Sequence, residues 1–217
     1  MSDVIKTSLV TAVFAVVHSV LASRGAKQLA GRLIGERERD AFYRPFYVAQ
    51  SLVTFGLLLL YARTLPERVL YQVRGPFALL MRAGQLAGLL HAFSAAYHAG
   101  ILRLLGLNNL VAWLDGREIP PGPMAQGPEM DSSARLTIGG PYRWSRHPLN
   151  FSPLPLFWLA PRLTVRRLVF NLVATVYLVL GSLHEEERLR AVYGDAYAAY
   201  QESDIPFYWP RFFRSPM

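Results

Sequence analysis

The chain has 217 residues, of which 52% are apolar and only 18% are charged, whereas soluble domains carry about 25% charged residues. This deficit favours lipid over water as the main solvent. The net charge is +8, but the basic residues form no long run, so the charge does not indicate nucleic-acid binding. The absence of cysteine excludes disulfides, zinc–thiolate sites, iron–sulfur clusters and a cysteine nucleophile.

Four apolar blocks along the chain are long enough to span a bilayer. They cover residues 4–22, 46–62, 77–105 and 165–183, each near or above the roughly 17–25 residues that a spanning helix needs. The first block has no small-residue cleavage site in the right place, so we interpret it as a retained helix rather than a signal peptide. In the third block, Gly84 and Gly88 form a small-xxx-small pattern, which favours packing within the chain over a dimer contact.

A fifth apolar block, at residues 148–160, is shorter. At about 1.5 Å per residue it reaches only about 20 Å, which is less than a hydrocarbon core of about 30 Å. Pro153 and Pro155 would interrupt its hydrogen-bond ladder. Either residues before Pro148 extend it across the membrane, or it is a half-helix supported by its neighbours. The turn at residues 161–164 leads into the last block, so these two blocks are predicted to form a tight helical hairpin.

Lysine and arginine are concentrated in the first loop, the third loop and the C-terminal tail. With five spans these segments share one face, which the positive-inside rule makes cytoplasmic. The sequence therefore predicts an all-α integral membrane protein of about five transmembrane helices, multi-pass in the inner membrane. It forms one domain, 1–217, with an N-terminal three-helix part at 1–110, a cytoplasmic loop at 111–140 and a C-terminal part at 141–217.

The densest group of reactive residues lies at 139–148. Two glycines and a proline form a turn, and Pro148 suits the first position of a helix, where its missing N–H is not needed. The N–H groups of that first turn are predicted to bind an anion. Arg146 adds a bidentate donor, and His147 donates or accepts near neutral pH. The alternative is a basic anchor for lipid headgroups at a helix start.

An acidic triplet, residues 185–187, ends the last apolar block. Carboxylates at a helix C-terminus oppose the helix dipole and repel one another, so a compensating cation is expected. In the predicted hairpin, Arg146 and His147 enter the membrane where Glu185 and Glu186 leave it. The two motifs should therefore meet, while a solvated charged face remains the alternative for Glu187.

Tyrosines and histidines provide the remaining candidates. The tyrosine stripe at residues 193–200 falls on one helix face and is typical of a packing surface rather than a ligand site. His18, His91 and His98 lie in apolar blocks, where ionisable residues are functional candidates. Bis-histidine haem ligation is one interpretation, but a hydrogen bond to a neighbouring carbonyl explains each histidine, and no metal site is predicted.

These motifs together resemble the integral membrane methyltransferase superfamily, which includes isoprenylcysteine carboxyl methyltransferases and phospholipid N-methyltransferases. The resemblance rests on Gly-Pro-Tyr-Arg at 140–143, Arg-His-Pro at 146–148, Glu-Glu-x-x-Leu at 185–189, Tyr-Gly-x-x-Tyr-x-x-Tyr at 193–200 and Ile-Pro at 205–206. The segment 157–170 looks most like bacterial methanethiol S-methyltransferases, and the N-terminal half is weakly similar to NnrU proteins.

The resemblance implies an enzyme that binds S-adenosyl-L-methionine at the cytoplasmic mouth between the last two spans. The cofactor-binding residues that it implies are Tyr142, Arg146, His147, Pro148, Glu185 and Glu186. Arg146 would hold the cofactor carboxylate, a glutamate its amino or ribose groups, and His147 would support it. This chain departs from the family at Asn150, where a tyrosine is usual, and at Asn108 and Asn109, where thiol methyltransferases tend to show Arg-Gln.

The acceptor implied by the resemblance is a small or hydrophobic thiol. One alternative keeps the fold and methylates a lipid or prenylated carboxylate or amine. The other is a non-enzymatic haem-binding or accessory membrane protein. The expected partners are the lipid bilayer and a small-molecule or lipid-like acceptor, without nucleic acid; the oligomeric state and a general base stay unassigned.

Overall fold

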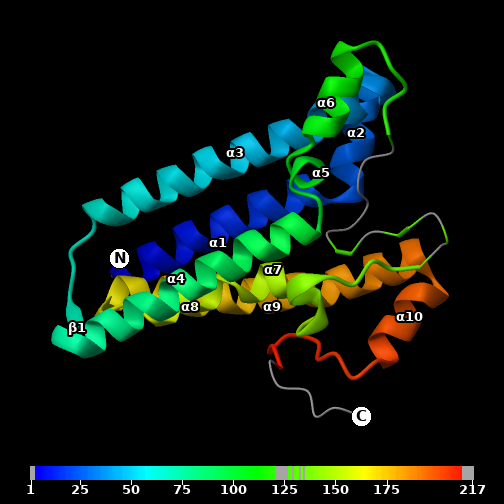
Figure 1. Cartoon of the computed structure of the whole chain (residues 1–217). Helices are drawn as coiled ribbons and strands as arrows, with labels where there is room; N and C mark the ends of the chain where they lie inside the picture. Colours follow the sequence, from blue (N-terminus) through cyan, green and yellow to red (C-terminus); the bar gives the residue numbers. More distant parts are fainter. Residues whose placement is uncertain (1–2, 121–126, 129, 132, 134, 212–217) are drawn as a thin grey trace. The chain divides into compact units, whose positions relative to one another are not determined.

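The computed structural model describes residues 3–120, 127–128, 130–131, 133 and 135–211. Long helices dominate these residues, and a short two-stranded sheet accompanies them (Figure 1). The chain forms two compact units that interleave along the sequence. Unit 1 comprises Met1–Leu70, Leu102–Pro123 and Thr164–Val173, and unit 2 comprises Tyr71–Ile101, Met124–Leu163 and Ala174–Met217. The division of a single domain at residues 110 and 140 stays a prediction.

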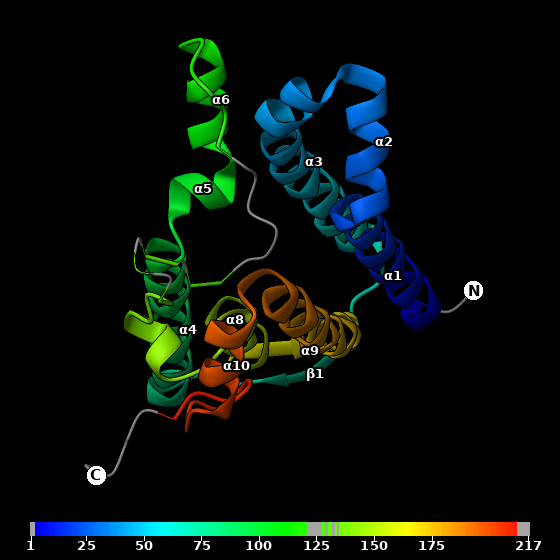
Figure 2. The ribbon, with the colours of Figure 1, turned by 90° about the vertical axis from the view of Figure 1, so that its right-hand side faces the viewer.

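Unit 1 is built on two long apolar helices, α1 (Asp3–Ala22) and α3 (Glu36–Thr64), which pack against each other (Figure 2). Helix α2 (Arg24–Ile34) connects them. It begins after Ser23, whose hydroxyl oxygen accepts a hydrogen bond from a backbone amide of α2 at 3.2 Å and so caps the helix. It ends at Gly35, whose φ of 95° lies in the left-handed region that glycine adopts most easily.

Helix α6 (Leu107–Leu114) follows the single-turn helix α5 (Ile101–Leu105) after a break at Gly106. The φ of Gly106 is 77°, and a Cβ atom there would lie 2.7 Å from the Cβ of Arg44 on α3. Only glycine fits this close approach. Since α6 extends to Leu114, the first residues of the predicted cytoplasmic loop, 111–114, are helical. Residues 121–126, 129, 132 and 134 of this loop lie outside the described part of the chain.

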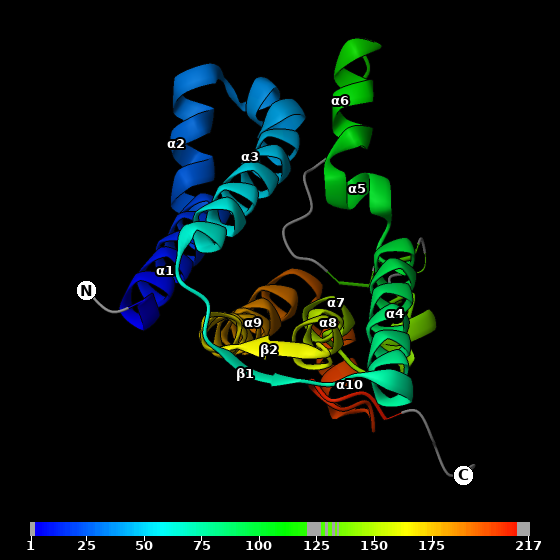
Figure 3. The same ribbon diagram turned by 90° about the vertical axis from the view of Figure 1, so that its left-hand side faces the viewer.

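Unit 2 is organised along helix α4 (Gly75–His98), which packs against the 3₁₀ turn η1 (Gly140–Arg143) and the short helices α7 (Pro148–Phe151) and α8 (Pro153–Trp158). Helix α9 (Val165–Tyr193) begins in unit 1 and continues into unit 2, where α10 (Asp195–Glu202) follows it. Strands β1 (Val69–Gln72) and β2 (Arg162–Thr164) form the sheet (Figure 3). The turn predicted at residues 161–164 thus contains strand β2.

The fifth apolar block is a broken helix rather than a continuous one. It divides into α7 and α8 because Pro153 has no N–H to continue the hydrogen-bond ladder. Carbonyl groups in this region accept hydrogen bonds from the side chains of Ser152, Gln85 and Tyr71, at 2.5, 2.9 and 3.2 Å. Neighbouring side chains therefore support the broken helix, as irregular backbone in a membrane protein requires.

The small-xxx-small pattern of α4 serves packing inside unit 2. A Cβ atom on Gly88 would lie 2.8 Å from the Cβ of Pro155, and one on Gly84 would collide with the side chain of Leu159. The two glycines therefore let α4 approach α8 closely. This contact is the intrachain role that the sequence favoured over dimerisation.

Three helices among the described residues are long and apolar enough to cross a membrane: α1, α3 and α9. Helix α4 has 24 residues, whereas α7 and α8 have only four and six. The predicted helical fold and the presence of helices able to span a membrane are confirmed, whereas the count of five spans stays a prediction. The fifth helix of the predicted set is replaced by α7 and α8, because its prolines interrupt the backbone hydrogen bonds.

Candidate functional site

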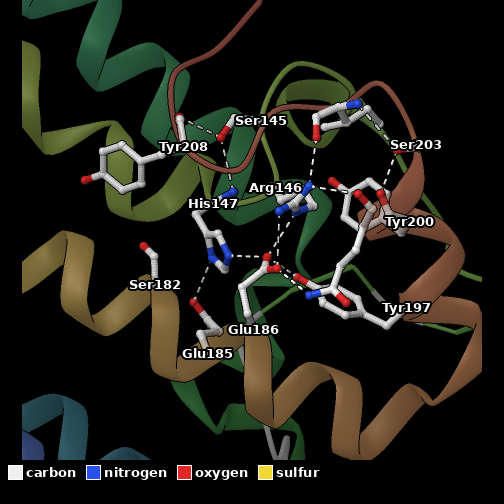
Figure 4. A network of polar contacts seen from close by, with 12 residues as sticks. Ser145, Arg146, His147, Ser182, Glu185, Glu186, Tyr197, Tyr200, Ser203 and Tyr208 are labelled. Atoms are coloured by element: carbon white, nitrogen blue, oxygen red, sulfur yellow. Dashed lines mark hydrogen bonds and ion pairs between the residues drawn. The ribbon is translucent and has the colours of Figure 1, made fainter.

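The two motifs singled out in the sequence meet inside unit 2, although 40 residues separate them (Figure 4). Arg146 lies in the loop between η1 and α7, and Glu186 lies near the end of α9. The Arg146 Nε donates to Glu186 Oε1 at 3.0 Å, and its Nη2 donates to Glu186 Oε2 at 3.3 Å. Both side chains are largely buried, with exposed fractions of 13% and 12%. The cation expected opposite the acidic triplet is therefore Arg146, held in a bidentate pair.

Arg146 also holds the chain that follows α10. Its Nη1 donates to the backbone carbonyls of Gln201, at 3.2 Å, and Ile205, at 3.0 Å. One guanidinium thus ties α9, α10 and the next segment to the loop before α7. Most of its donors are engaged within the protein.

Glu186 is the centre of the polar network. Besides Arg146, it accepts hydrogen bonds from the hydroxyl of Tyr197 at 2.7 Å and from the Nε2 of Gln201 at 2.5 Å, and its Oε1 lies 2.7 Å from the Nε2 of His147. Burial and the hydrogen bond to Glu186 raise the pKa of Tyr197, so its hydroxyl stays protonated and acts as a donor. Sequence reasoning missed Tyr197 and Gln201 as site residues. Their spacing of four on α10, which puts both on one helix face, was the available signal.

His147 lies between two carboxylates and is only 2% exposed. Its Nε2 faces Glu186, and its Nδ1 lies 3.4 Å from Glu185 Oε2. Burial lowers the pKa of the imidazole, but the hydrogen bonds and negative charge of the two glutamates outweigh burial and raise the pKa overall. A protonated ring can donate from both nitrogens, whereas a neutral ring can donate from only one. The geometry therefore favours the imidazolium form, and the two cations Arg146 and His147 balance the two glutamates.

Glu185 is held more loosely than Glu186. Its Oε2 accepts a hydrogen bond from the Nδ2 of Asn150 at 3.3 Å and lies 3.4 Å from His147. The side chain is 16% exposed. Adjacent residues of one helix point about 100° apart, so the two glutamates approach His147 from different sides, Glu185 at Nδ1 and Glu186 at Nε2. These contacts of Glu185 are longer than most of those that Glu186 makes.

The remaining predicted cofactor residues, Tyr142 and Pro148, are buried beneath this network. Tyr142 is 1% exposed, and its backbone carbonyl accepts a hydrogen bond from the Tyr200 hydroxyl at 2.6 Å. Pro148 is the first residue of α7, as predicted. Helix α7 has only four residues, so the dipole behind the predicted anion site is smaller than the sequence suggested.

A C-terminal strap, defined here as residues 205–211, crosses the loop that carries Arg146. The Arg146 amide donates to the carbonyl of Pro206 at 3.0 Å, and the Ser145 hydroxyl donates to the carbonyl of Tyr208 at 2.8 Å. The ring of Phe207 lies 5.1 Å from the His147 ring and 5.9 Å from the Arg146 guanidinium carbon. The strap therefore walls the site with an aromatic ring. In the sequence, only its Ile-Pro pair was singled out.

Each histidine predicted in an apolar helix contacts a protein oxygen. The Nδ1 and Nε2 of His18 lie 3.0 Å and 2.6 Å from the hydroxyls of Ser51 and Tyr47 in unit 1. In unit 2, His91 Nδ1 lies 2.8 Å from the Ser152 hydroxyl, and His98 Nδ1 lies 2.8 Å from a backbone carbonyl on its own helix. These contacts agree with packing roles.

The predicted glycine turn is explained by His98. A Cβ atom on Gly139 would lie 2.6 Å from Cδ2 of the His98 ring, and one on Gly140 would also collide with the ring. Gly140 has a φ of 50°, which further favours glycine. The end of α4 therefore fixes the start of η1, and through it the loop with Arg146.

Chemically, this arrangement is a buried and charge-balanced cluster beside a partly exposed carboxylate. It can bind a ligand that carries both positive and negative groups, because it contains fixed donors and fixed acceptors within a few ångströms. Among the described residues, no group of three or more histidine, cysteine, aspartate or glutamate side chains could hold a metal ion.

The curated proteins that this chain resembles are methanethiol S-methyltransferases. The chain is 29% identical to methanethiol S-methyltransferase 1 of Bradyrhizobium diazoefficiens, over 92% of this chain and 64% of that protein. It is 30% identical to methanethiol S-methyltransferase of Mycobacterium tuberculosis, over 91% of this chain and 75% of that protein, and 29% identical to methanethiol S-methyltransferase 2 of Bradyrhizobium diazoefficiens, over 94% and 72%. The chain thus spans about two thirds to three quarters of these relatives. No protein-family model and no solved structure matches it.

Proposed function

Because the chain belongs to the methanethiol S-methyltransferase family, we propose that it is a membrane enzyme that transfers a methyl group from S-adenosylmethionine to a small thiol. The relatives carry methanethiol in their names as the acceptor. Membership of the membrane methyltransferase superfamily, which the motifs implied, is confirmed by these relatives. The observation that carries the proposal for this chain is the cluster in which Arg146, His147, Glu185 and Glu186 meet.

The chemistry of the cluster fits the proposed cofactor. S-adenosylmethionine carries a carboxylate, an ammonium group, ribose hydroxyls and a sulfonium, so its site needs donors and anionic acceptors together. Glu185 is partly exposed and has carboxylate oxygens to accept from the amino or ribose groups. Among the described residues, the Arg146 Nη2 contacts only Glu186, so one of its two N–H groups is available to the cofactor carboxylate.

The contributions of the chain are binding, orientation and exclusion of water. When bound, S-adenosylmethionine would supply an electrophilic methyl group for in-line displacement by the thiolate form of the acceptor. The sulfonium C–S bond would break as the new C–S bond forms, so both products would be neutral thioethers. Glu185 and Arg146 orient the donor, and Glu186 holds Arg146 in place. His147 keeps its proton between the glutamates and supports the same surface. Most of the rate then comes from holding donor and acceptor at near-attack distance.

Tyr142 and Pro148 act from beneath the surface in this proposal. Their burial lets them fix the shape of the loop that carries Arg146 and His147. Phe207 adds an aromatic wall beside both cations. A site walled by buried side chains keeps water away from the charged groups and so strengthens their interactions.

We place the enzyme in the inner membrane, with several spans and the site facing the cytoplasm. The bias of lysine and arginine toward the first loop, the third loop and the tail supports this orientation. The acceptor then reaches the site from the cytoplasm or from the inner leaflet.

The experiment that tests the proposal measures binding of S-adenosylmethionine to the detergent-purified protein by calorimetry. Methyl transfer from labelled cofactor is then assayed with methanethiol and with thiols of increasing chain length. We expect saturable binding and the highest turnover with small thiols. Activity that rises with chain length would instead indicate a lipid or prenylated acceptor. Absence of both binding and transfer would refute the methyltransferase proposal.

The same samples test the haem-binding alternative. Replacing His18, His91 or His98 with Gln should leave turnover within a few-fold, because each ring contacts protein oxygens. A Soret absorption band that disappears in one of these variants would favour the haem-binding protein. The matched comparison is Glu185→Gln, which should lose turnover while the visible spectrum stays flat.

A further inference from the structure

Asn150 makes three hydrogen bonds within unit 2. It lies in the single turn of α7, three residues after His147. Its Nδ2 donates to the hydroxyl oxygen of Ser182 at 2.9 Å and to Glu185 Oε2 at 3.3 Å. Its backbone carbonyl accepts a hydrogen bond from the Tyr208 hydroxyl at 2.8 Å. One residue therefore connects α7 with α9 and with the C-terminal strap.

The orientation of the Asn150 amide follows from its partners. The Ser182 hydroxyl uses its only proton to donate to the backbone carbonyl of Leu178 at 2.9 Å. Its oxygen can therefore only accept from Asn150. The ionised carboxylate of Glu185 also accepts only. Both partners require the NH₂ group, so the amide has a single favourable orientation and both of its protons are used.

This amide limits the freedom of Glu185. A glutamate side chain has several rotamers, and fixing one of them costs conformational entropy. Ser182 is fully buried and anchors Asn150 from the same helix that carries Glu185, three residues earlier. With Asn150 fixed on one side and His147 Nδ1 on the other, the Glu185 carboxylate is directed toward the histidine.

We propose that Asn150 is a positioning residue for methyl transfer, which orients the Glu185 carboxylate against His147 before the cofactor binds. The inference rests on the proposed function for its link to catalysis. The structural part of the inference, that Asn150 orients the Glu185 carboxylate against His147, can be tested in the protein without cofactor. Asn150 acts through Glu185 and needs no contact with the acceptor.

The first readout is the titration of His147, followed by NMR with labelled histidine and assigned with the variant His147→Gln. The charged groups around this ring are Glu185 and Glu186 from α9 and Arg146 from its own loop; Phe207 of the strap adds an uncharged ring. In Asn150→Leu, whose side chain has the same branched heavy-atom skeleton but no amide, Glu185 loses the hydrogen bond that holds it from α7. The protonated ring then loses one acceptor, so its titration midpoint should move to lower pH.

The second readout is the kinetics with S-adenosylmethionine. Asn150→Leu should raise KM for the cofactor by roughly tenfold with kcat little changed, since a lost hydrogen bond to a charged group corresponds to about this factor. Asn150→Asp should raise it further, because a second carboxylate then faces Glu185. Asn150→Gln keeps the amide and should recover part of the loss. If Asn150→Leu folds poorly, Ser182→Ala removes only the anchor and should move both readouts less, in the same direction.

The matched control is Asn109→Leu in unit 1. The Asn109 amide also donates to two oxygens at 2.9 Å, but both are backbone carbonyls, those of Asp40 and Pro120. This variant should lower thermal stability while the His147 titration and KM stay as in the parent. A stability loss in Asn150→Leu with unchanged titration and KM would overturn the proposal. If the parent protein fails to bind S-adenosylmethionine, the proposed function falls, and the His147 titration alone decides whether Asn150 positions Glu185.

Discussion

Neutralising Glu186 should mainly lower the stability of the protein, whereas neutralising Glu185 should mainly weaken its binding of the cofactor. Glu186 receives hydrogen bonds from Arg146, Tyr197 and Gln201 and faces His147, at distances of 2.5–3.3 Å. Glu185 makes longer contacts with Asn150 and His147, at 3.3 and 3.4 Å. Glu186→Gln keeps the size of the side chain but leaves the buried guanidinium without its counter-charge. Breaking such a pair from one side costs about 3–5 kcal/mol.

The expected magnitudes are large enough to separate in a thermal melt. For a chain of this size, 1 kcal/mol shifts Tm by about 2–4 °C, so a loss of about 3 kcal/mol in Glu186→Gln corresponds to roughly 6–12 °C. Glu185→Gln leaves no guanidinium without its counter-charge, and the amide oxygen can still accept the hydrogen bond from Asn150. The loss should therefore be close to that of one hydrogen bond, about 1 kcal/mol, so its Tm should fall by about 4 °C or less. Its affinity for S-adenosylmethionine should nevertheless drop about tenfold or more, because this carboxylate faces the proposed cofactor.

The assay is differential scanning fluorimetry of the detergent-purified variants, followed by calorimetry with S-adenosylmethionine. Glu187→Gln is the matched control, since this glutamate is exposed at the same helix end and should change neither quantity. A stability loss in Glu185→Gln as large as that in Glu186→Gln would refute the division of roles. Unchanged cofactor affinity in Glu185→Gln would refute the assignment of this carboxylate to the ligand.

Three further predictions concern the charges of the site and the topology. Arg146→Lys keeps the charge but cannot form the bidentate pair with the carboxylate, so cofactor affinity measured by calorimetry should fall roughly tenfold, and an unchanged affinity would argue against a role for Arg146. His147 has a folded pKa raised above its ordinary value of 6.5, so its contribution to stability is complete below 6.5 and is lost as pH rises through the higher folded pKa. Tm should therefore decline across that window, and a slope that persists in His147→Gln would contradict this origin. Because the chain has no native cysteine, single cysteines introduced at residues 24–44, at residues 115–140 and in the tail should all be labelled from the cytoplasmic side, and labelling of the last two from opposite sides would break the topology.

Much of the site's outline was predictable from the sequence. The apolar blocks marked α1, α3 and α9, because continuous apolar length is itself the condition for spanning a bilayer. The meeting of Arg146 with the acidic triplet followed from electrostatics, since carboxylates at a helix C-terminus need a cation. The glycine pattern of α4 indicated a close helix contact, and α8 makes that contact. In each case the sequence shows a local requirement, for apolar length, for a counter-charge or for a small residue, which the folded chain then has to satisfy.

The identities of the partners were decided only by the tertiary structure. The choice of Glu186 as the network centre depends on the rotation of α9 about its axis, which places adjacent residues about 100° apart and is fixed by packing. Tyr197, Gln201 and the strap reach the site because α10 and the strap fold back onto the loop before α7, through hydrogen bonds between residues 55 and 59 positions apart. The carbonyls of Leu156 and Ala160, toward the end of α8, accept hydrogen bonds from Gln85 and Tyr71, which come from distant parts of the chain. Spacing and motifs mark some of these residues in the sequence, but they do not name the partner of each, since that depends on where a distant segment lies in space.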